Sequence, residues 1–337
     1  MPAEGSILSP VVSLRAYPRV HVTLIDCGFA TQRMYGGFGM AIDGLPVEVG
    51  AALAAGRSLK TDSHLDTRTA GQISARLTRV AESLGLEGFD VEISLPGRLQ
   101  HVGLGVGTAA TLGALQALHL AAGSAPAPGE VRRWSGRGGA SGIGSHTFFT
   151  GGFAIDFGHD VPPASRRFLP SGAVEPDRPP PALSLGAGPP DWRIGLFLPP
   201  GRPTSGDGEV SLFQSVMPID DDQILKTLAA VYHGVVPAVL TADVALLKEA
   251  MQLVRAHGFK RLEVASQGEV VAGLLQRLDA VPDAAVGMSS VGPLVWVIGE
   301  ATAVDAARRL VVDKDVAFLG AFRIRSTGYE ITSETVT

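Results

Sequence analysis

The sequence predicts a two-domain protein of mixed α/β (α+β) class. The chain has 337 residues, which exceeds the usual size of one domain. Strand-like and helix-like segments alternate along it, and a proline-rich stretch over residues 162–190 separates two groups of them. We therefore expect an N-terminal domain over residues 1–178 and a C-terminal domain over residues 179–337.

In the first half, strands are expected where β-branched residues alternate with others, and helices where apolar residues recur every three or four positions. The expected strands are 19–26, 47–52, 89–95 and 151–157, and the expected helices are 66–84 and an alanine- and leucine-rich segment that runs up to Gly123. Residues 33–42 are rich in glycine, which predicts a turn.

The stretch over 162–190 is expected to be a linker without strand or helix, because proline lacks an amide donor. Beyond it we expect strands at 192–198, 294–298 and 316–324, and helices at 221–240, 242–257, 268–278 and 302–310. A few strands mixed with several helices predict an α+β domain.

Composition narrows the classes of function. The net charge of −5 and the pI near 5.9 argue against binding to nucleic acid or to an anionic membrane. The one cysteine, Cys27, excludes an intrachain disulfide and suits a reducing compartment. Since the sequence has neither a leader peptide nor an apolar run of membrane-spanning length, we expect a cytoplasmic protein.

A glycine-rich loop over residues 100–110 is the clearest functional signal. Gly103, Gly105 and Gly107 alternate before Thr108, and a helix is expected to begin there. Glycine permits close approach of a ligand, and the free amides of a helix N-terminus attract anions, so the loop predicts a phosphate site.

Other interpretations of this loop stay open. It fits the loose dinucleotide pattern G-x-G-x-x-A, but residues 96–100 separate it from the preceding strand and no acidic residue follows at the required distance. A Walker P-loop pattern is absent from the sequence. A helix entry packed tightly on a sheet is the structural alternative.

Two further glycine-rich segments strengthen the phosphate hypothesis. Residues 136–144 contain Arg137, Ser141 and Gly142, and residues 287–293 contain Ser289 and Ser290 before a strand. Either could be a simple turn, but three such loops in one chain favour a common ligand.

The order of these loops resembles the GHMP superfamily of small-molecule kinases. That resemblance implies a two-domain GHMP-kinase-like fold with a ferredoxin-like C-terminal domain, and a site in the cleft between the domains. In kinases of the mevalonate type the S-G-I sequence precedes an aspartate that acts as the base. Here Ser141, Gly142 and Ile143 precede Gly144, which implies different chemistry on a phosphorylated substrate.

A closer resemblance, to the β-ribofuranosylaminobenzene 5′-phosphate synthase family, covers most of the chain. The matching positions are 19–26, Arg33 with 36–39, 101–105, 136–144, 151–153 with Asp156 and His159, 237–238 with Asp243, and 289–290 with 292–293. Met288 and Val291 depart from the family, where a glutamine and an aromatic residue are expected.

This resemblance implies a decarboxylating condensation of 4-aminobenzoate with phosphoribosyl pyrophosphate, which yields a C-riboside, CO₂ and pyrophosphate in methanopterin biosynthesis. It implies Mg²⁺ with the pyrophosphate, no nucleotide cofactor, no nucleic-acid or membrane partner, and a homodimer. Protein carboxylates as metal ligands stay an alternative. An ATP-dependent kinase and a catalytically silent phosphosugar-binding relative are the alternative functions.

Candidate site residues follow from the loops and the resemblance. Asp26 and Arg33 are the expected catalytic pair, with an ordinary strand-end ion pair as the alternative. Asp156 and His159 are either metal ligands or part of a strand-end turn. The expected phosphate and substrate ligands are Arg19, His21, Gly103, Gly105, Gly107, Thr108, Arg137, Ser141, Gly142, Ser289 and Ser290. The sequence leaves the metal ligands and the aminobenzoate pocket unassigned.

Overall fold

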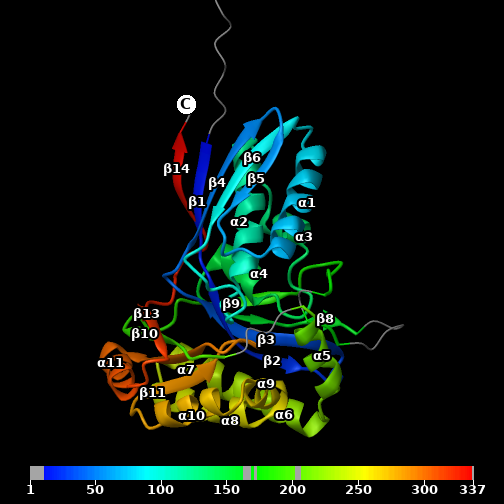
Figure 1. Cartoon of the computed structure of the whole chain (residues 1–337). Helices are drawn as coiled ribbons and strands as arrows, with labels where there is room; N and C mark the ends of the chain where they lie inside the picture. Colours follow the sequence, from blue (N-terminus) through cyan, green and yellow to red (C-terminus); the bar gives the residue numbers. More distant parts are fainter. Residues whose placement is uncertain (1–10, 162–167, 171–172, 202–205, 336–337) are drawn as a thin grey trace, which may run out of the picture.

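The computed structural model describes residues 11–161, 168–170, 173–201 and 206–335. One sheet lies at the top of Figure 1, and its strands follow the order β14–β1–β4–β6–β5. Helix α2 packs on β1 and β4, and α1 packs beside α2. The elements of this layer are β1 (Val11–Ala16), β4 (Val47–Ala54), β5 (Arg57–Thr61), β6 (Gly88–Ser94), β14 (Glu330–Thr335), α1 (Thr67–Ser83), α2 (Val106–Ala121) and α3 (Pro128–Ser135).

A second sheet lies across the middle of the molecule (Figure 1). Its antiparallel strands follow the order β2–β3–β7–β9, and β8 pairs with the start of β3. The elements are β2 (Arg19–Asp26), β3 (Arg33–Ala41), α4 (Ile143–Thr150), β7 (Phe153–Asp156), β8 (His159–Asp160) and β9 (Ala182–Gly186). Because α4 contacts β2, β3 and β7, it covers one face of this sheet.

The third sheet has four antiparallel strands in the order β11–β12–β10–β13. Chain order across it is strand, helices, two strands, helix and strand, which is the ferredoxin-like arrangement. The elements are β10 (Trp192–Leu198), α5 (Asp207–Val216), α6 (Asp221–Ala230), the π-helical turn η1 (Val231–Val235), α7 (Val236–Thr241), α8 (Val244–Ala256), α9 (Gly258–Gln267), α10 (Glu269–Leu278), β11 (Ala284–Met288), β12 (Val295–Glu300), α11 (Ala301–Leu310) and β13 (Ala317–Phe322). The mixed α/β (α+β) class is confirmed.

Two predicted irregular segments are strands. Residues 33–41 form β3, and glycine serves there for close packing, since a Cβ on Gly37 would lie 2.8 Å from the carbonyl oxygen of Thr23. Part of the proline-rich stretch forms β9, which can pair with β7 because residues 182–186 contain no proline. The expectations of a turn and of a strand-free linker were therefore wrong at these positions.

A helical run over 221–241 is long and apolar enough to span a membrane by length and composition alone. The expectation that no segment reaches that length is corrected. The same run is η1 with α6 and α7 on either side, and these elements pack on α8.

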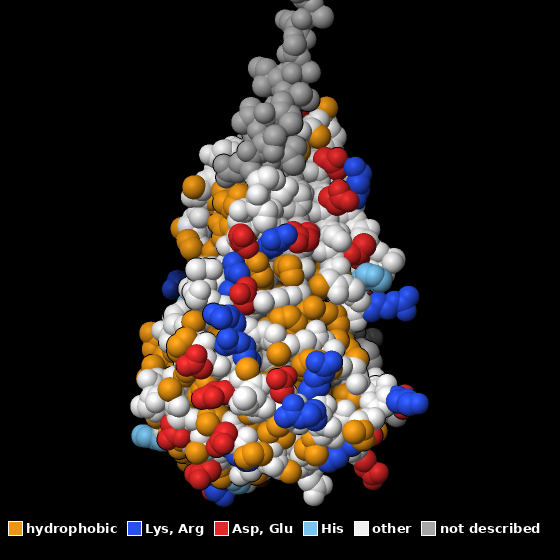
Figure 2. Space-filling model, turned by 90° about the vertical axis from the view of Figure 1, so that its left-hand side faces the viewer, with side chains coloured by type: hydrophobic (Ala, Val, Ile, Leu, Met, Phe, Trp, Pro, Cys, Tyr) orange, Lys and Arg blue, Asp and Glu red, His pale blue; other side chains and the backbone are white. Residues whose placement is uncertain are grey.

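The predicted domain boundary at 178/179 stays a prediction. Two strands from beyond it join sheets built mainly by residues before it, since β9 pairs with β7 and β14 pairs with β1. The face in Figure 2 carries basic, acidic and hydrophobic side chains intermixed, without one sign dominating.

A buried ion pair lies within α9. Lys260 and Glu263 are 0% and 1% exposed, and their Nζ and Oε2 atoms are 2.6 Å apart. The Lys260 ammonium also donates to the carbonyl oxygen of Met288 (3.2 Å) at the end of β11. Burial lowers the pKa of Lys260 and raises the pKa of Glu263, so each charge depends on the other.

We expect Glu263→Leu to lower the free energy of unfolding by about 3–5 kcal/mol, because it leaves a buried ammonium alone. Lys260→Met combined with Glu263→Leu should recover most of that loss in urea titrations. The surface pair of Asp222 and Lys226 (2.7 Å) is exposed, so Asp222→Ala should lower the free energy of unfolding far less. A double variant no more stable than the single one would contradict this account.

Candidate functional site

A cavity of about 440 Å³ opens beside the N-terminus of α2. Its wall contains seven of the predicted ligands: Arg19, Gly103, Gly105, Gly107, Thr108, Arg137 and Ser290. The rest of its lining comes from α1, α5, the start of the first glycine loop, the late glycine loop and the segment before β9. It includes Asp66, Arg68, Thr69, Gln72, Gln100, His101, Glu209 and Val210. The structure thus brings together loops that are far apart in sequence.

The first glycine loop ends in a helix N-terminus that no side chain caps within the described residues. Gly105 is the N-cap residue, with φ of 66°, and Gly103 has φ of 109°. A Cβ on Gly103 would lie 2.2 Å from the carbonyl oxygen of Ser289. Glycine is therefore required here by backbone conformation and by packing, and the first helical amides stay available to an anion.

The carbonyl oxygen of Gly103 is a junction between three segments. It accepts hydrogen bonds from Arg19 Nη1 (2.6 Å) and from Ser289 Oγ (2.7 Å). Ser289 Oγ in turn accepts a bond from the backbone amide of His21 (3.0 Å). Strand β2, the first glycine loop and the late loop therefore hold one another before any ligand binds.

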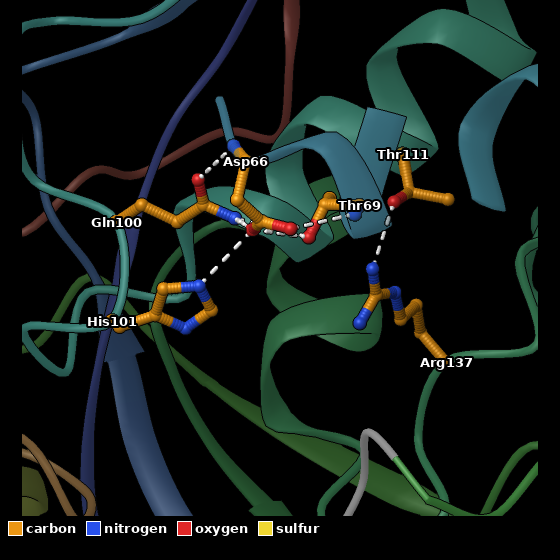
Figure 3. Close-up of polar contacts among 6 residues, drawn as sticks. All are labelled: Asp66, Thr69, Gln100, His101, Thr111 and Arg137. Atoms are coloured by element: carbon orange, nitrogen blue, oxygen red, sulfur yellow. Dashed lines mark hydrogen bonds and ion pairs between the residues drawn. The ribbon is translucent and has the colours of Figure 1, made fainter. Parts of the chain in front are cut away.

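A polar network forms the rim of the cavity beside α1 (Figure 3). The Asp66 carboxylate accepts bonds from the amide and hydroxyl of Thr69 (2.8 and 2.7 Å) and from Gln100 Nε2, and lies 3.1 Å from His101 Nε2. Burial raises the pKa of Asp66, but the bonds from Thr69 and His101 outweigh it and lower the pKa to about 2. Asp66 therefore stays ionised and fixes this rim.

Three arginines, Arg19, Arg68 and Arg137, line the cavity and supply positive charge. Arg137 donates from Nη2 to Thr111 Oγ1 (3.2 Å), on the first turns of α2 (Figure 3). Burial lowers the pKa of Arg19 and of Arg137 to about 10, so both guanidinium groups remain charged at neutral pH. Arginine suits phosphate because its fork can donate two parallel hydrogen bonds.

One carboxyl group in this cavity titrates near neutral pH. Glu209, on α5, is half-buried, and burial together with the charge of Glu263 raises its pKa to about 7 against the opposing effect of Arg19. A group with such a pKa changes the charge of the cavity over the physiological range.

Side chains of Asp156 and His159 bind the backbone of the second glycine loop. Asp156 accepts bonds from the amides of Gly142 (2.5 Å) and Gly158 (2.7 Å), and His159 Nε2 lies 2.7 Å from the carbonyl oxygen of Gly138. These contacts favour the strand-end turn over a metal site for Asp156 and His159. Ser141 and Gly142 do not line the cavity, whereas Arg137 from the same loop does.

Gly144 stands where the sequence resemblance to mevalonate-type kinases predicts an aspartate. A Cβ there would lie 3.3 Å from Thr108 Cγ2 and 3.5 Å from Arg19 Cγ. The missing carboxylate would thus stand beside the phosphate loop, and in this chain Arg19 occupies the neighbouring space.

Asp26 and Arg33 lie outside the lining of this cavity. The Asp26 carboxylate accepts four backbone amides, from residues 28–31 (2.8–3.3 Å). Arg33 pairs with Asp160 (2.7 Å) and donates to the carbonyl oxygens of Phe157 and Gly158. The two side chains are therefore not paired with each other.

His21 and Ser289 lie behind the loop. His21 is 2% exposed, and among the described residues neither of its ring nitrogens has a hydrogen-bond partner. Burial and the charges of Arg19 and Lys260 lower its pKa well below the usual value, so the ring is neutral. Its backbone, which binds Ser289 and Ser290, supports the site.

The candidate ligands predicted from the sequence did not include Asp66, Thr69, Gln100, His101 or Glu209, although Gln100 and His101 lie in the predicted phosphate loop. Asp66 carried a signal, since it stands at the expected start of a helix, where aspartate commonly caps. Glu209 carried none, because only the packing of α5 brings it to the cavity.

Solved structures with a similar fold are GHMP-type enzymes. A homoserine kinase from Cytophaga hutchinsonii superposes with a TM-score of 0.68 at 15% identity, covering 98% of this chain and 100% of that one. The phosphomevalonate kinase of Streptococcus pneumoniae superposes with a TM-score of 0.67 at 12% identity, and the match covers 93% of this chain and 99% of that one. The mevalonate diphosphate decarboxylase of Staphylococcus aureus superposes with a TM-score of 0.62 at 14% identity, and the match covers 96% of this chain and 98% of that one. The predicted GHMP-kinase-like fold is confirmed.

No protein-family model matches the sequence. Curated relatives do match, and they are named β-ribofuranosylphenol 5′-phosphate synthase. The Archaeoglobus fulgidus protein is 31% identical over 300 residues, which cover 89% of this chain and 91% of that protein. The Methanothermobacter thermautotrophicus protein is 29% identical over 82% of this chain and 85% of its own length. The chain therefore belongs to the β-ribofuranosylphenol 5′-phosphate synthase family, a group of enzymes that act on a ribose phosphate.

Proposed function

We propose that this enzyme joins phosphoribosyl pyrophosphate to a benzoate that carries an amino or hydroxyl group opposite its carboxylate. The observation that carries the proposal is the uncapped N-terminus of α2 in a cavity with Arg19 and Arg137. 4-Aminobenzoate is the acceptor implied by the sequence resemblance, and the phenol in the relatives' name points to 4-hydroxybenzoate. We also propose that the enzyme is cytoplasmic and acts as a homodimer.

The proposed reaction exchanges a carboxylate for a ribosyl group at one ring carbon. That carbon attacks C1 of the ribose, and the electrons of the C1–O bond leave with pyrophosphate. The bond to the carboxylate then breaks, its electrons return to the ring, and CO₂ departs. A para amino or hydroxyl group stabilises the positive ring between these steps, and no net proton is exchanged.

Negative charge grows on pyrophosphate as it leaves, and the cavity has groups to meet it. A helix N-terminus contributes about 0.3–1 kcal/mol toward an anion, which is too little alone. Arg19 and Arg137 add fixed positive charge, and a preorganised charge stabilises a transition state without reorganisation. Arg19 also holds the loop through Gly103, so it acts on both geometry and charge.

Mg²⁺ would fit with the pyrophosphate rather than in a cage of protein ligands. The described residues contain no group of three or more His, Cys, Asp or Glu side chains placed for a metal. Magnesium commonly binds one or two carboxylates and completes its shell with phosphate oxygens and water. Glu209 and Asp66 are the lining carboxylates that would hold it. Bound there, it would neutralise charge on the leaving group.

The kinase alternative loses support at Gly144, where a carboxylate base would be needed beside Thr108. We further propose that Asp26 and Arg33 are positioning residues, because the Asp26 carboxylate is engaged by four amides and Arg33 by Asp160 and two carbonyls. Neither side chain lines the cavity that we propose for the phosphates.

Purified enzyme with phosphoribosyl pyrophosphate, Mg²⁺ and carboxyl-labelled 4-hydroxybenzoate or 4-aminobenzoate is expected to release labelled CO₂ and one pyrophosphate per CO₂. Unsubstituted benzoate should release neither, because nothing stabilises the positive ring. Labelled CO₂ would be trapped and pyrophosphate measured by a coupled assay. Folded enzyme that releases no CO₂ with either acid, or that transfers phosphate from ATP to an alcohol, would contradict the proposal.

Arg19→Ala is expected to raise the KM for phosphoribosyl pyrophosphate at least tenfold, or about 1.4 kcal/mol, because it removes a charge and a support of the loop. Arg15→Ala is the matched control, since Arg15 is exposed on β1 and pairs with Glu48 at the surface. Steady-state kinetics and thermal unfolding of both variants provide the measurement. Equal KM values in the two variants would remove Arg19 from the phosphate site.

Glu209→Gln is expected to change how anion affinity depends on pH. At about pH 6 the wild-type carboxyl is mostly protonated and resembles glutamine, whereas at about pH 8 it is ionised and repels anions. Calorimetry with inorganic pyrophosphate in EDTA should therefore give equal affinities at the lower pH and several-fold tighter binding by the variant at the higher pH. Because the variant and the wild type are compared at the same pH, the titration of pyrophosphate itself affects both equally. A ratio that stays constant with pH would contradict this role.

A further inference from the structure

We propose that the aromatic acid binds in a second cavity, lined by Phe29, Phe168 and Phe213, next to the phosphate cavity. This inference rests on the proposed function and names the acceptor site that the sequence left unassigned. The cavity has a volume of about 790 Å³, and Gln214 and Met217 lie in the same wall. We refer to it below as the aromatic cavity.

The rings of this wall are arranged to hold a flat ligand. Phe29 and Phe168 have centroids 4.5 Å apart with planes at 35°, and Tyr35 meets Phe168 edge-on at 5.6 Å. Phe213, from α5, packs against Phe259, with centroids 4.9 Å apart. Because aromatic rings attract one another in offset and edge-to-face arrangements, this wall favours a ligand with a benzene ring.

The two cavities share structural elements, as the reaction requires. On α5, Glu209 and Val210 line the phosphate cavity, and Phe213 and Gln214, one turn later, line the aromatic cavity. Between β8 and β9, Leu169 lines the aromatic cavity and the next residue, Pro170, lines the phosphate cavity. The two linings therefore adjoin along α5 and at residues 169–170.

This placement gives Asp26 a role. Its Oδ1 accepts the amides of Gly28 (3.1 Å) and Phe29 (2.8 Å), and both residues line the aromatic cavity. Phe29 has φ of 67°, a conformation that a non-glycine residue keeps only when its surroundings enforce it. A Cβ on Gly28 would overlap the carbonyl oxygen of Ile219, so this loop closely approaches the chain that follows α5. Asp26 thus shapes the aromatic wall from behind.

Strand β3 fixes the other wall. The Tyr35 hydroxyl donates to the carbonyl oxygen of Leu169 (2.9 Å) and accepts from its amide (2.7 Å). Both backbone groups of a lining residue are therefore satisfied by one side chain, and Phe168 is held edge-on to the Tyr35 ring.

The charge of the lining suits a reaction that expels CO₂. Among its described lining residues, Asp221 is the charged one, and none is Lys or Arg. A bound carboxylate that faces the like charge of Asp221 without a cation among these residues is less stable than in water, and departure of CO₂ relieves that cost. Gln214 supplies an amide that can donate to the carboxylate and orient it.

Gln214→Glu tests the site, because it places a negative charge opposite the acid at nearly constant volume. We expect the KM for 4-hydroxybenzoate to rise at least tenfold while the KM for phosphoribosyl pyrophosphate stays within twofold. Ser211→Glu is the matched control, since Ser211 is exposed on the same helix and lines neither cavity. That variant should leave both KM values unchanged. Equal effects of the two substitutions on the acceptor KM would overturn the inference.

Direct binding separates this inference from the proposed function. Saturation-transfer NMR with 4-hydroxybenzoate should detect binding to the wild type and to Ser211→Glu, and weaker binding to Gln214→Glu. If the wild type turns over neither acid but shows this binding pattern, the proposed reaction fails and the aromatic cavity stands. If turnover occurs and Gln214→Glu binds the acid as well as the wild type does, the cavity is wrong and the reaction stands.

Discussion

The carbonyl oxygen of Gly103 is the point on which the rest of the site depends. Arg19 and Ser289 both donate to it, from strand β2 and from the late loop, and a side chain at Gly103 would overlap the Ser289 backbone. This junction fixes the loop that precedes α2, and the loop in turn aims the helix N-terminus into the cavity. A rigid anion site needs such support because dipoles stabilise charge best when they do not have to reorganise.

From that junction the site extends along α5 into two compartments of different chemistry. One compartment is lined by three guanidinium groups, a helix N-terminus and a carboxyl group whose pKa burial raises to about 7. The other has aromatic walls. A fold shared with kinases can thus support glycosyl transfer, since Gly144 stands at the expected position of the kinase base and the proposed acceptor cavity has aromatic side chains in its wall.

The sequence predicted those helices, strands and glycine positions that depend on neighbouring residues in the chain. Strand β2 and helix α1 follow from periodicity, helix α2 follows from its alanine- and leucine-rich composition, and Gly103, Gly105 and Gly107 follow from backbone freedom. What could not be predicted depends on contacts distant in sequence. The glycines of β3 predicted a turn, although they allow close packing against β2. Strand β9 was missed because prolines precede and follow it in the sequence. Glu209 reaches the cavity only through the docking of α5, and the aromatic wall joins Phe29 to Phe168 and Phe213.

The most direct measurement is a crystal structure of the enzyme with phosphoribosyl pyrophosphate bound in the absence of an acceptor. The account predicts that the pyrophosphate group contacts the first amides of α2 and the guanidinium of Arg19, with ribose C1 turned toward α5 and the aromatic cavity. Pyrophosphate bound elsewhere, with the N-terminus of α2 left to solvent, would contradict it.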